Sequence, residues 1–498
     1  MNNLRNKRNL FETRLGRSLI GTTALCASLL FSVNASAKVR LPHVLSDGMV
    51  LQQQSDARLW GWAKAGKTVT VAPNWTAEKY NTKASKDGRF EIRVKTPAAS
   101  FTPLSISFDD GEGAVTIGNI LSGEVWVCAG QSNMEMPVMG FGNCPVQDYN
   151  NVVADAVNNR GLRFCKIPSV TCMTPRDDAD CRWLDADIQN VSNASATGYF
   201  FGRMLSRTLN IPVGLIEANK GGSRVESWLN KENCEKYTDE NLDSVAMVRD
   251  IEYDYYRPMV WGNGTFNPIQ NYTVKGILFY QGCSNVGYHT PQYAFRLSKL
   301  VEQWRKGFGE GDIPFYLVQI APFDYGPGID GAKLREQQVK ALSLIPNSDI
   351  VCTNDLVYPY EKGQIHPTQK RQVGERLAFI ALNHNYGFTG IRCESAQFDK
   401  MDIVGDTCFI KLKNDYGGVS RYDGIEGFEV AGSDKVFHKA EAKHFWVPGN
   451  NKHNEWIAVI SKDVAKPVAV RYCFKNFQIG NLKNQALLPL IPFRTDEW

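Results

Sequence analysis

The spacing of apolar residues divides the chain into three parts. Residues 38–115 alternate between apolar and polar positions, as in Phe90, Ile92 and Val94 after a Lys-Asp-Gly turn. A period of two is typical of half-buried strands, so we predict a small N-terminal β-sandwich domain. Short alternating runs return over residues 389–498 and predict a C-terminal β-sandwich-like domain.

Residues 116–388 instead alternate continuous apolar runs with amphipathic stretches. The apolar runs predict five buried strands, at residues 123–130, 213–218, 274–282, 313–321 and 348–353. Three other stretches carry apolar residues at helical spacing: Phe201, Leu205 and Leu209 in the first, Leu297 to Phe308 in the second, and Val373 to Ala381 in the third. Strands that are buried on both faces and alternate with helices favour an α/β fold with a mostly parallel sheet flanked by helices.

Residues 1–37 have the pattern of a signal peptide. Basic residues precede the apolar stretch 19–33, and Ala35-Ser36-Ala37 fits a cleavage site. The stretch is shorter than the roughly 20 residues of a membrane span, although an uncleaved anchor stays the alternative. Cleavage predicts a periplasmic or secreted protein without stable membrane insertion.

The charge balance depends on this leader. The chain has 56 Lys and Arg against 52 Asp and Glu, and residues 1–37 hold five of the former and one of the latter. The rest of the chain is therefore neutral, which gives no reason to propose a nucleic acid or an acidic membrane as a partner. The oligomeric state is left open.

Eleven of the twelve cysteines follow the leader. Export permits disulfides, and one group of five could hold long loops together. The members of this group are Cys144, Cys165, Cys172, Cys181 and Cys234. Neither a Cys-x-x-Cys pair nor a His-Glu-x-x-His motif occurs, so we expect no metal site.

Candidate functional residues follow four of the predicted strands. Ser132 follows the first, and Gly221-Gly222 the second. Gln281 and Asn285 follow the third, and His366 lies in the loop after the last. Because ligands bind at the carboxyl ends of parallel strands, we expect these residues to meet at one edge of the sheet.

These residue types together suit acyl transfer. A histidine can accept the proton of a serine nucleophile near neutral pH. Glycine N–H groups and Gln or Asn side chains can stabilise the oxyanion that forms. Each residue alone is more often an ordinary loop residue, and Cys283 with the nearby His289 is a rival nucleophile.

Five segments then point to a family. They are GEVWVCAGQSNMEMPV (123–138), GLIEANKGGSRVESW (214–228), FYQGCSN (279–285), IHPTQKRQVGERLA (365–378) and PFRTDEW (492–498). In this order they resemble sialate O-acetylesterases, which are carbohydrate esterases of the SGNH-hydrolase type. The resemblance implies a serine esterase that removes O-acetyl groups from sugars, typically sialic acids, without a metal or organic cofactor.

By position, the resemblance makes Ser132 the nucleophile and His366 the general base. Gly221 and Gly222 match the backbone oxyanion donor. The segment from Gln281 to Asn285 matches the block that supplies a side-chain donor and shapes the pocket.

The chain departs from the family pattern in two respects. Cys283 stands where the family usually has glutamate, which removes a carboxylate from the pocket wall. Positions 363 and 364, where an acid usually precedes the histidine, hold Gly and Gln. Glu361 and Asp355 are the nearest carboxylates, and we hypothesise a Ser–His dyad in which a backbone carbonyl orients His366.

Two other functions stay open. The enzyme could act on acetylated xylan or another plant glycan, because neutral charge and a missing glutamate do not decide the sugar. A glycan-binding protein without catalysis is the alternative from another class, although a pure binder needs neither Ser132 nor His366.

Overall fold

The computed structural model describes residues 38–420 and 424–498. The predicted leader, residues 1–37, lies outside the described residues, so its cleavage stays a prediction. Among the described residues, no helix is long and apolar enough to cross a membrane.

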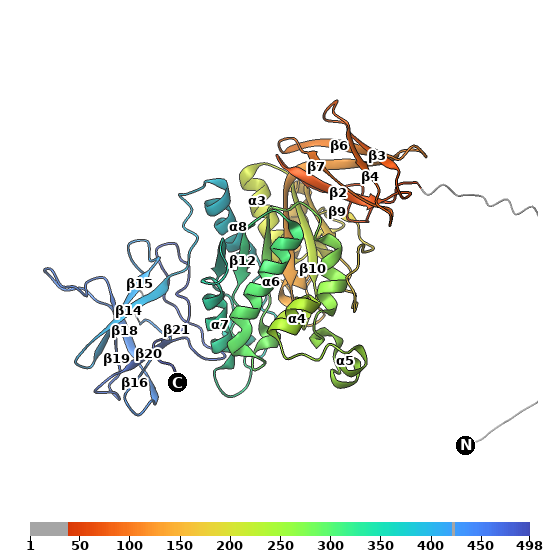
Figure 1. The fold of residues 1–498 in the computed structure, drawn as a ribbon. Coiled ribbons are helices and arrows are strands. Elements are labelled where there is room, and N and C mark those ends of the chain that lie inside the picture. Colours follow the sequence, from red (N-terminus) through yellow and green to blue (C-terminus); the bar gives the residue numbers. More distant parts are fainter. Residues whose placement is uncertain (1–37, 421–423) are drawn as a thin grey trace, which may run out of the picture. The chain divides into compact units, whose positions relative to one another are not determined.

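The first seven strands build the N-terminal part of the fold (Figure 1, red to orange). They are β1 (Val50–Gln52), β2 (Asp56–Trp62), β3 (Thr68–Pro73), β4 (Tyr80–Lys83), β5 (Arg89–Lys95), β6 (Ser100–Asp109) and β7 (Val115–Gly130). β2 pairs with β5 alone, whereas β3, β4 and β6 connect to β7. The alternating side chains of β3, with Val69 and Val71 buried, show why the period-two pattern predicts this region.

β7 is shared by two parts of the fold. It pairs with β6 and β1 up to Gly123, and with β10 and β11 from Glu124 to Gly130. The boundary predicted between residues 115 and 116 therefore falls at the start of a strand that both parts use. One continuous strand joins the N-terminal strands to the central sheet.

The central sheet has the strand order β13-β12-β11-β7-β10-β8-β9. Its other strands are β8 (Leu162–Lys166), β9 (Trp183–Asp185), β10 (Val213–Asn219), β11 (Gly276–Tyr280), β12 (Phe315–Val318) and β13 (Ser348–Val351). All neighbours are parallel except the edge pair β8–β9. The predicted mostly parallel sheet is confirmed, and the parallel strands end at one common edge.

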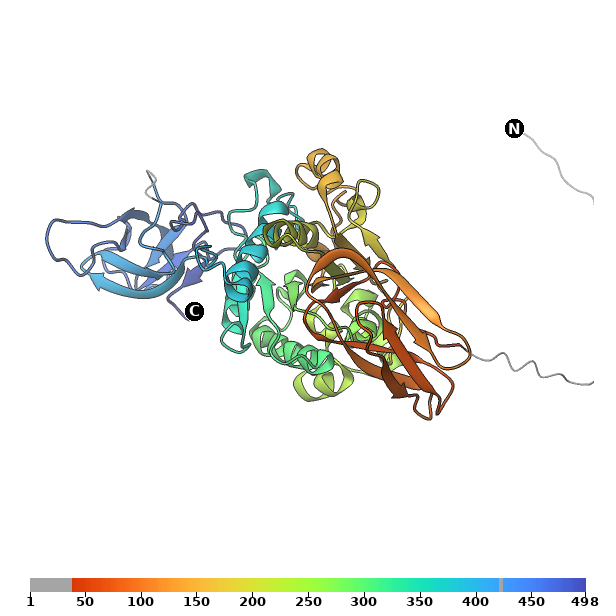
Figure 2. The same ribbon diagram turned by 90° about the horizontal axis from the view of Figure 1, so that it is seen from above.

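Helices cover both faces of this sheet (Figures 1 and 2). They are α1 (Ser132–Glu135), α2 (Tyr149–Asp155), α3 (Ala196–Leu209), α4 (Lys231–Tyr237), α5 (Ser244–Asp250), α6 (Tyr293–Phe308), α7 (Asp330–Ala341) and α8 (Arg371–Tyr386). Val125 and Val127 of β7 pack in the core that contains α6, whereas Trp126 and Cys128 pack in the core that contains α3 and α8. Both faces of β7 are therefore buried, which explains its unbroken apolar sequence.

The C-terminal strands form two antiparallel four-stranded sheets, β14-β15-β19-β18 and β17-β16-β20-β21. They are β14 (Gln397–Val404), β15 (Thr407–Lys413), β16 (Phe428–Ala431), β17 (Phe437–Lys439), β18 (Glu441–His444), β19 (Ile457–Ile460), β20 (Ala469–Tyr472) and β21 (Phe493–Arg494). Ile410 and Val459 of one sheet share a core with Val430 and Val470 of the other. This is the expected sandwich, and the predicted boundary at residue 389 lies between α8 and β14.

The eleven cysteines of the described residues are all free. The group of five named as potential disulfide partners is therefore not bonded in this structure. Cys165 and Cys234 are fully buried in the core, where a thiol behaves as a small apolar group. Packing in the core thus accounts for Cys165 and Cys234, two of the five cysteines that the sequence left as candidate crosslinks.

Candidate active site

Ser132 is the first residue of α1 and follows the carboxyl end of β7. Gly130 makes this turn possible: its φ is +141°, and a Cβ there would lie 2.3 Å from the Tyr280 carbonyl oxygen. Only glycine lets β7 end so close to β11. At the first position of a helix, the Ser132 N–H has no intrahelical acceptor. The turn therefore presents both the hydroxyl and the backbone N–H of Ser132.

His366 lies against this serine. Its Nε2 is 2.8 Å from Ser132 Oγ. Asn133 donates to the Ile365 carbonyl, and Lys370 Nζ donates to Asn133 Oδ1. The residue directly after the serine thus holds the histidine loop. The sequence signals for Asn133 and Lys370 are their places in the family segments 123–138 and 365–378.

The environment keeps His366 neutral. Burial, and to a smaller extent the nearby Lys370 ammonium, together lower the pKa of His366 to about 4. Lys370 is itself only 1% exposed, and burial lowers its pKa to about 7. A neutral imidazole accepts a proton at one nitrogen and donates at the other. His366 can therefore accept the Ser132 proton at neutral pH.

The second ring nitrogen of His366 does not meet an acid. Its Nδ1 lies 3.5 Å from Cys144 Sγ. Glu361 accepts two backbone N–H groups of its own loop, and Asp355 forms ion pairs with two basic side chains. Both candidate acids are thus engaged elsewhere. The hypothesis of a backbone carbonyl partner is corrected, because a thiol takes that place in the described structure.

Gly221 lies beside Ser132, as predicted. A Cβ on Gly221 would be 3.4 Å from Ser132 Cβ. The Gly221 N–H donates to Glu135 Oε2 over 2.5 Å, so it already binds an anionic oxygen. Gly222 has a φ of +79° and is backed by the ring of Tyr255, which leaves no room for a side chain. An oxyanion at the Gly221 N–H must displace the Glu135 carboxylate.

Gln281 and Asn285 do not serve as free donors. Gln281 Nε2 donates to the Ser223 carbonyl and to Asn285 Oδ1. Asn285 Oδ1 also accepts the Val225 N–H, and its Nδ2 donates to Glu226. Both side chains are fully buried. In place of the predicted oxyanion contact, the geometry gives them a bracing role beneath the glycine loop.

Cys283 and His289 do not form a pair in the described structure. Cys283 is buried, and burial raises the pKa of its thiol. His289 instead lies against Asp239, with Nε2 3.6 Å from Oδ1. The rival Cys–His nucleophile is therefore not assembled.

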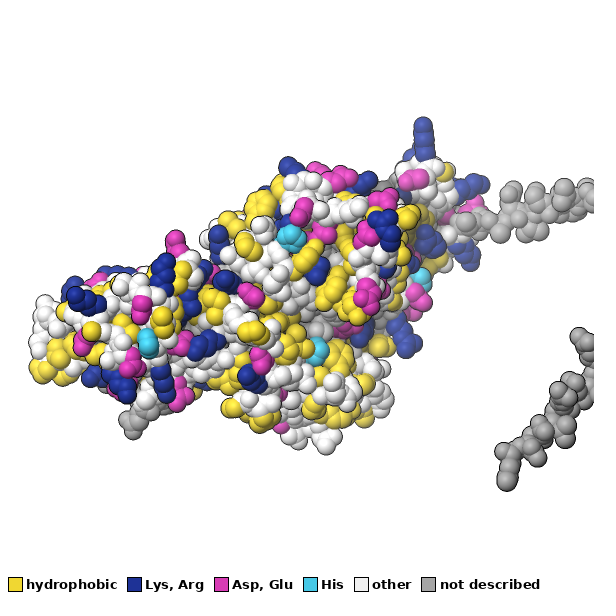
Figure 3. Space-filling model, turned by 90° about the horizontal axis from the view of Figure 1, so that it is seen from below, with side chains coloured by type: hydrophobic (Ala, Val, Ile, Leu, Met, Phe, Trp, Pro, Cys, Tyr) yellow, Lys and Arg dark blue, Asp and Glu magenta, His cyan; other side chains and the backbone are white. Residues whose placement is uncertain are grey.

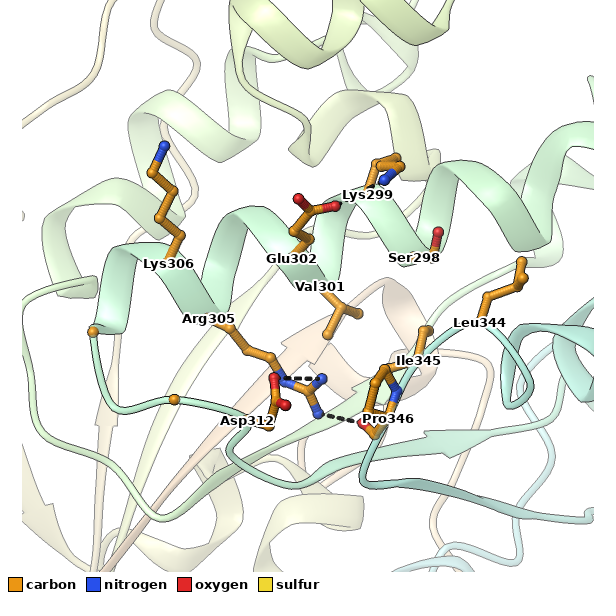
Figure 4. A pocket seen from close by; sticks show the side chains of 12 residues that line it. Ser298, Lys299, Val301, Glu302, Arg305, Lys306, Asp312, Leu344, Ile345 and Pro346 are labelled. Carbon is orange, nitrogen blue, oxygen red and sulfur yellow. Dashed lines mark hydrogen bonds and ion pairs between the residues drawn. The ribbon is translucent and has the colours of Figure 1, made fainter.

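Two other features lie at the opposite, amino edge of the sheet. A cavity of about 560 Å³ opens beside α6, where Arg305 donates to the Ile313 and Pro346 carbonyls (Figure 4). Asp349, His384 and Glu394 bring potential metal-ligand atoms within 4.8 Å of one another. The sequence did not predict this group, and its place at the start of β13 separates it from Ser132.

The site and fold together define a class. A parallel sheet whose carboxyl edge presents a serine hydroxyl to a neutral imidazole is the arrangement of an α/β serine hydrolase. On the face in Figure 3, basic and acidic side chains are interspersed, so this face does not favour a polyanionic partner.

Comparison with known proteins specifies the family. The model for carbohydrate esterases described as sialic acid-specific acetylesterase matches residues 122–383, more than half of the chain. The chain therefore belongs to this family and is a carbohydrate O-acetylesterase, as the resemblance implies.

The relatives span most of the chain. Human sialate O-acetylesterase is 26% identical over 429 residues, which cover 76% of this chain and 77% of that protein. The mouse sialate O-acetylesterase is 24% identical and covers 93% of this chain and 95% of its own. The crystal structure of a carbohydrate acetylesterase from Xanthomonas citri has a TM-score of 0.81 and 29% identity, and covers 92% of this chain and 100% of its own. Their similarity extends to the flanking β parts.

Proposed function

We propose that this enzyme removes O-acetyl groups from sialic acids through an acyl-enzyme on Ser132. The single observation that supports the mechanism best is the contact of 2.8 Å between Ser132 Oγ and His366 Nε2. Ser132 Oγ attacks the acetyl carbonyl while His366 takes its proton, and His366 then gives this proton to the leaving sugar hydroxyl. Water, activated by the same imidazole, releases acetate and regenerates Ser132.

The oxyanion of each tetrahedral intermediate needs preorganised donors. We assign this role to the N–H groups of Ser132 and of the Gly221-Gly222 turn. The Gly221 N–H already holds a carboxylate oxygen, which supports its affinity for negative charge. The Glu135 side chain, which is partly exposed, moves aside when the acetyl group binds.

A cation near this loop favours an acidic sugar. The Arg224 guanidinium lies between the rings of Tyr256 and Tyr288, 4.0 and 3.3 Å from their centroids. Its Nε donates to the Ser284 carbonyl, and it attracts the Glu240 carboxylate, which accepts from the Tyr288 hydroxyl, without an ion-pair contact among the described residues. A sialic acid carries a carboxylate that Arg224 could bind in a bidentate manner, whereas xylan carries none.

The test compares acetate release from 9-O-acetylated sialic acid and from acetylxylan, for the native enzyme and for Arg224→Gln. We expect the sialic acid to be preferred. Arg224→Gln should lower kcat/KM for it about 10-fold or more, because a charge-assisted hydrogen bond is lost. Hydrolysis of 4-nitrophenyl acetate, which has no carboxylate, is the control and should change little. Preferred turnover of acetylxylan, unaffected by the substitution, would instead support the plant-glycan alternative.

We also propose that the enzyme works in the periplasm or outside the cell. The basic start, the apolar stretch and Ala35-Ser36-Ala37 support this location. N-terminal sequencing of the exported protein should find Lys38 first, and retention of residues 1–37 would contradict it.

A further inference from the structure

We propose that Cys144 is the positioning residue of His366, with a neutral thiol in the place that a carboxylate holds in a Ser-His-Asp triad. This inference rests on the proposed function, in which His366 is the general base. It assigns a role to a residue that sequence analysis considered only as a disulfide partner.

A tight turn holds Cys144 against the imidazole. Phe141 and Cys144 exchange two backbone hydrogen bonds, of 2.9 and 3.0 Å. The Phe141 ring meets the His366 ring edge to face, with centroids 5.3 Å apart. Cys144 is 2% exposed, so its thiol is fixed and shielded from solvent. The same turn therefore contacts both the ring surface and Nδ1 of His366.

The hydrogen-bond partners of the thiol determine the tautomer of the imidazole. Cys144 Sγ lies 3.2 Å from Asn143 Oδ1 and 3.2 Å from Gln364 Oε1. Both are amide oxygens, which only accept, and both lie closer to the sulfur than His366 Nδ1 does, so we assign the single thiol proton to one of them. The sulfur then offers a lone pair to His366, and Nδ1 must carry the ring proton. Nε2 is left unprotonated, facing Ser132 Oγ, as a general base requires.

Gln364 stabilises the same arrangement from the histidine side. Its Oε1 also accepts the backbone N–H of His366. The amide thus links the loop backbone, the thiol and the imidazole. Position 364 is where the family pattern expects an acid, so this chain orients its histidine by neutral hydrogen bonds.

A neutral partner also fits the electrostatics of the site. Lys370 is the charged group that acts on the imidazole, and it opposes protonation. A carboxylate at Nδ1 would attract the second proton and raise the pKa of His366, whereas a thiol adds no charge. The pH below which the enzyme loses activity therefore distinguishes a thiol partner of Nδ1 from a carboxylate partner.

Three substitutions at Cys144 test the role, with 4-nitrophenyl acetate as the substrate. Cys144→Ala should lower kcat about 10- to 100-fold with little change in KM, because the tautomer is no longer fixed. Cys144→Ser retains a donor and an acceptor and should keep most of the activity. Cys144→Asp should move the acid limb of the kcat/KM profile to higher pH by about one unit or more. Cys408→Ala, at a buried thiol of the C-terminal sandwich, is the matched control and should leave kcat and the profile unchanged.

The outcomes separate this inference from the proposed function. Native kcat and an unchanged acid limb in Cys144→Ala would overturn the positioning role while Ser132→Ala and His366→Ala stay inactive. If Cys144→Ala does not fold, an unshifted acid limb in folded Cys144→Asp overturns it equally. Activity retained by Ser132→Ala would instead refute the proposed function itself.

Discussion

His366 has the surroundings of a base that stays unprotonated over a wide pH range. Burial opposes its positive form, and the Lys370 ammonium adds repulsion. Cys144 supplies a hydrogen-bond partner without a counter-charge. This imidazole is a weaker base than one that is paired with an acid. We therefore expect its orientation toward Ser132 to contribute a larger share of the rate enhancement.

This environment predicts the pH dependence of the reaction. The productive form of His366 is neutral, and its pKa of about 4 lies below the ordinary value of 6.5. We expect kcat/KM for 4-nitrophenyl acetate to rise with pH through about 4 and to be level from there to neutrality. Rates measured between pH 3 and 7.5, with stability checked at each pH, provide the test. An acid limb near 6.5 would show that the site does not perturb the base.

The role of a residue could be predicted from the sequence only where its place after a strand brings it to the site. Ser132 and His366 meet because each follows a strand at one edge of the sheet. Gln281 and Asn285 were predicted to be oxyanion donors, but their amides bind neighbouring buried side chains. The sequence does not show this, because packing sets the hydrogen-bond partners. Cys144 gave no signal of its contact with His366, because it does not lie directly after a predicted strand.

At the scale of elements, burial decides what the sequence reveals. β7, β10 and β11 are buried on both faces, so their apolar runs are plain. α7 was not predicted, because its buried face contains Arg335 and Gln338 and lacks an apolar period. Gln338 bonds the Ile320 N–H and the Gln281 carbonyl, so this helix contacts the sheet through polar groups.

For the complete chain, the sequence pattern predicts the parallel and antiparallel sheets but not the connections between them. β7 runs through the predicted first boundary, because both neighbouring sheets accept the same strand. The C-terminal sandwich contacts the α/β part through ion pairs, in which Lys483 meets Asp355 and Arg494 meets Glu336. Such long-range pairs leave no periodic signal in the sequence.

Substitution of Asp355 tests whether its carboxylate has a structural or a catalytic role. Its carboxylate is 6% exposed and pairs with Arg376 of α8 and with Lys483. Asp355→Asn should lower the free energy of unfolding by about 3 kcal/mol, because two basic groups lose a buried partner. Denaturant unfolding measures this loss, with the exposed pair variant Asp250→Asn as a control that should leave the free energy of unfolding nearly unchanged. The kcat of the folded variant should be native, and a collapse of kcat like that of His366→Ala would make Asp355 the missing triad acid.

The proposed mechanism depends above all on Ser132 as the nucleophile of this carbohydrate O-acetylesterase. The most direct measurement is the hydrolysis of 4-nitrophenyl acetate by folded Ser132→Ala beside the native enzyme. We predict a loss of kcat of about 10⁴-fold or more, because the acyl-enzyme cannot form. Native-like turnover by the variant would contradict the assignment and the mechanism derived from it.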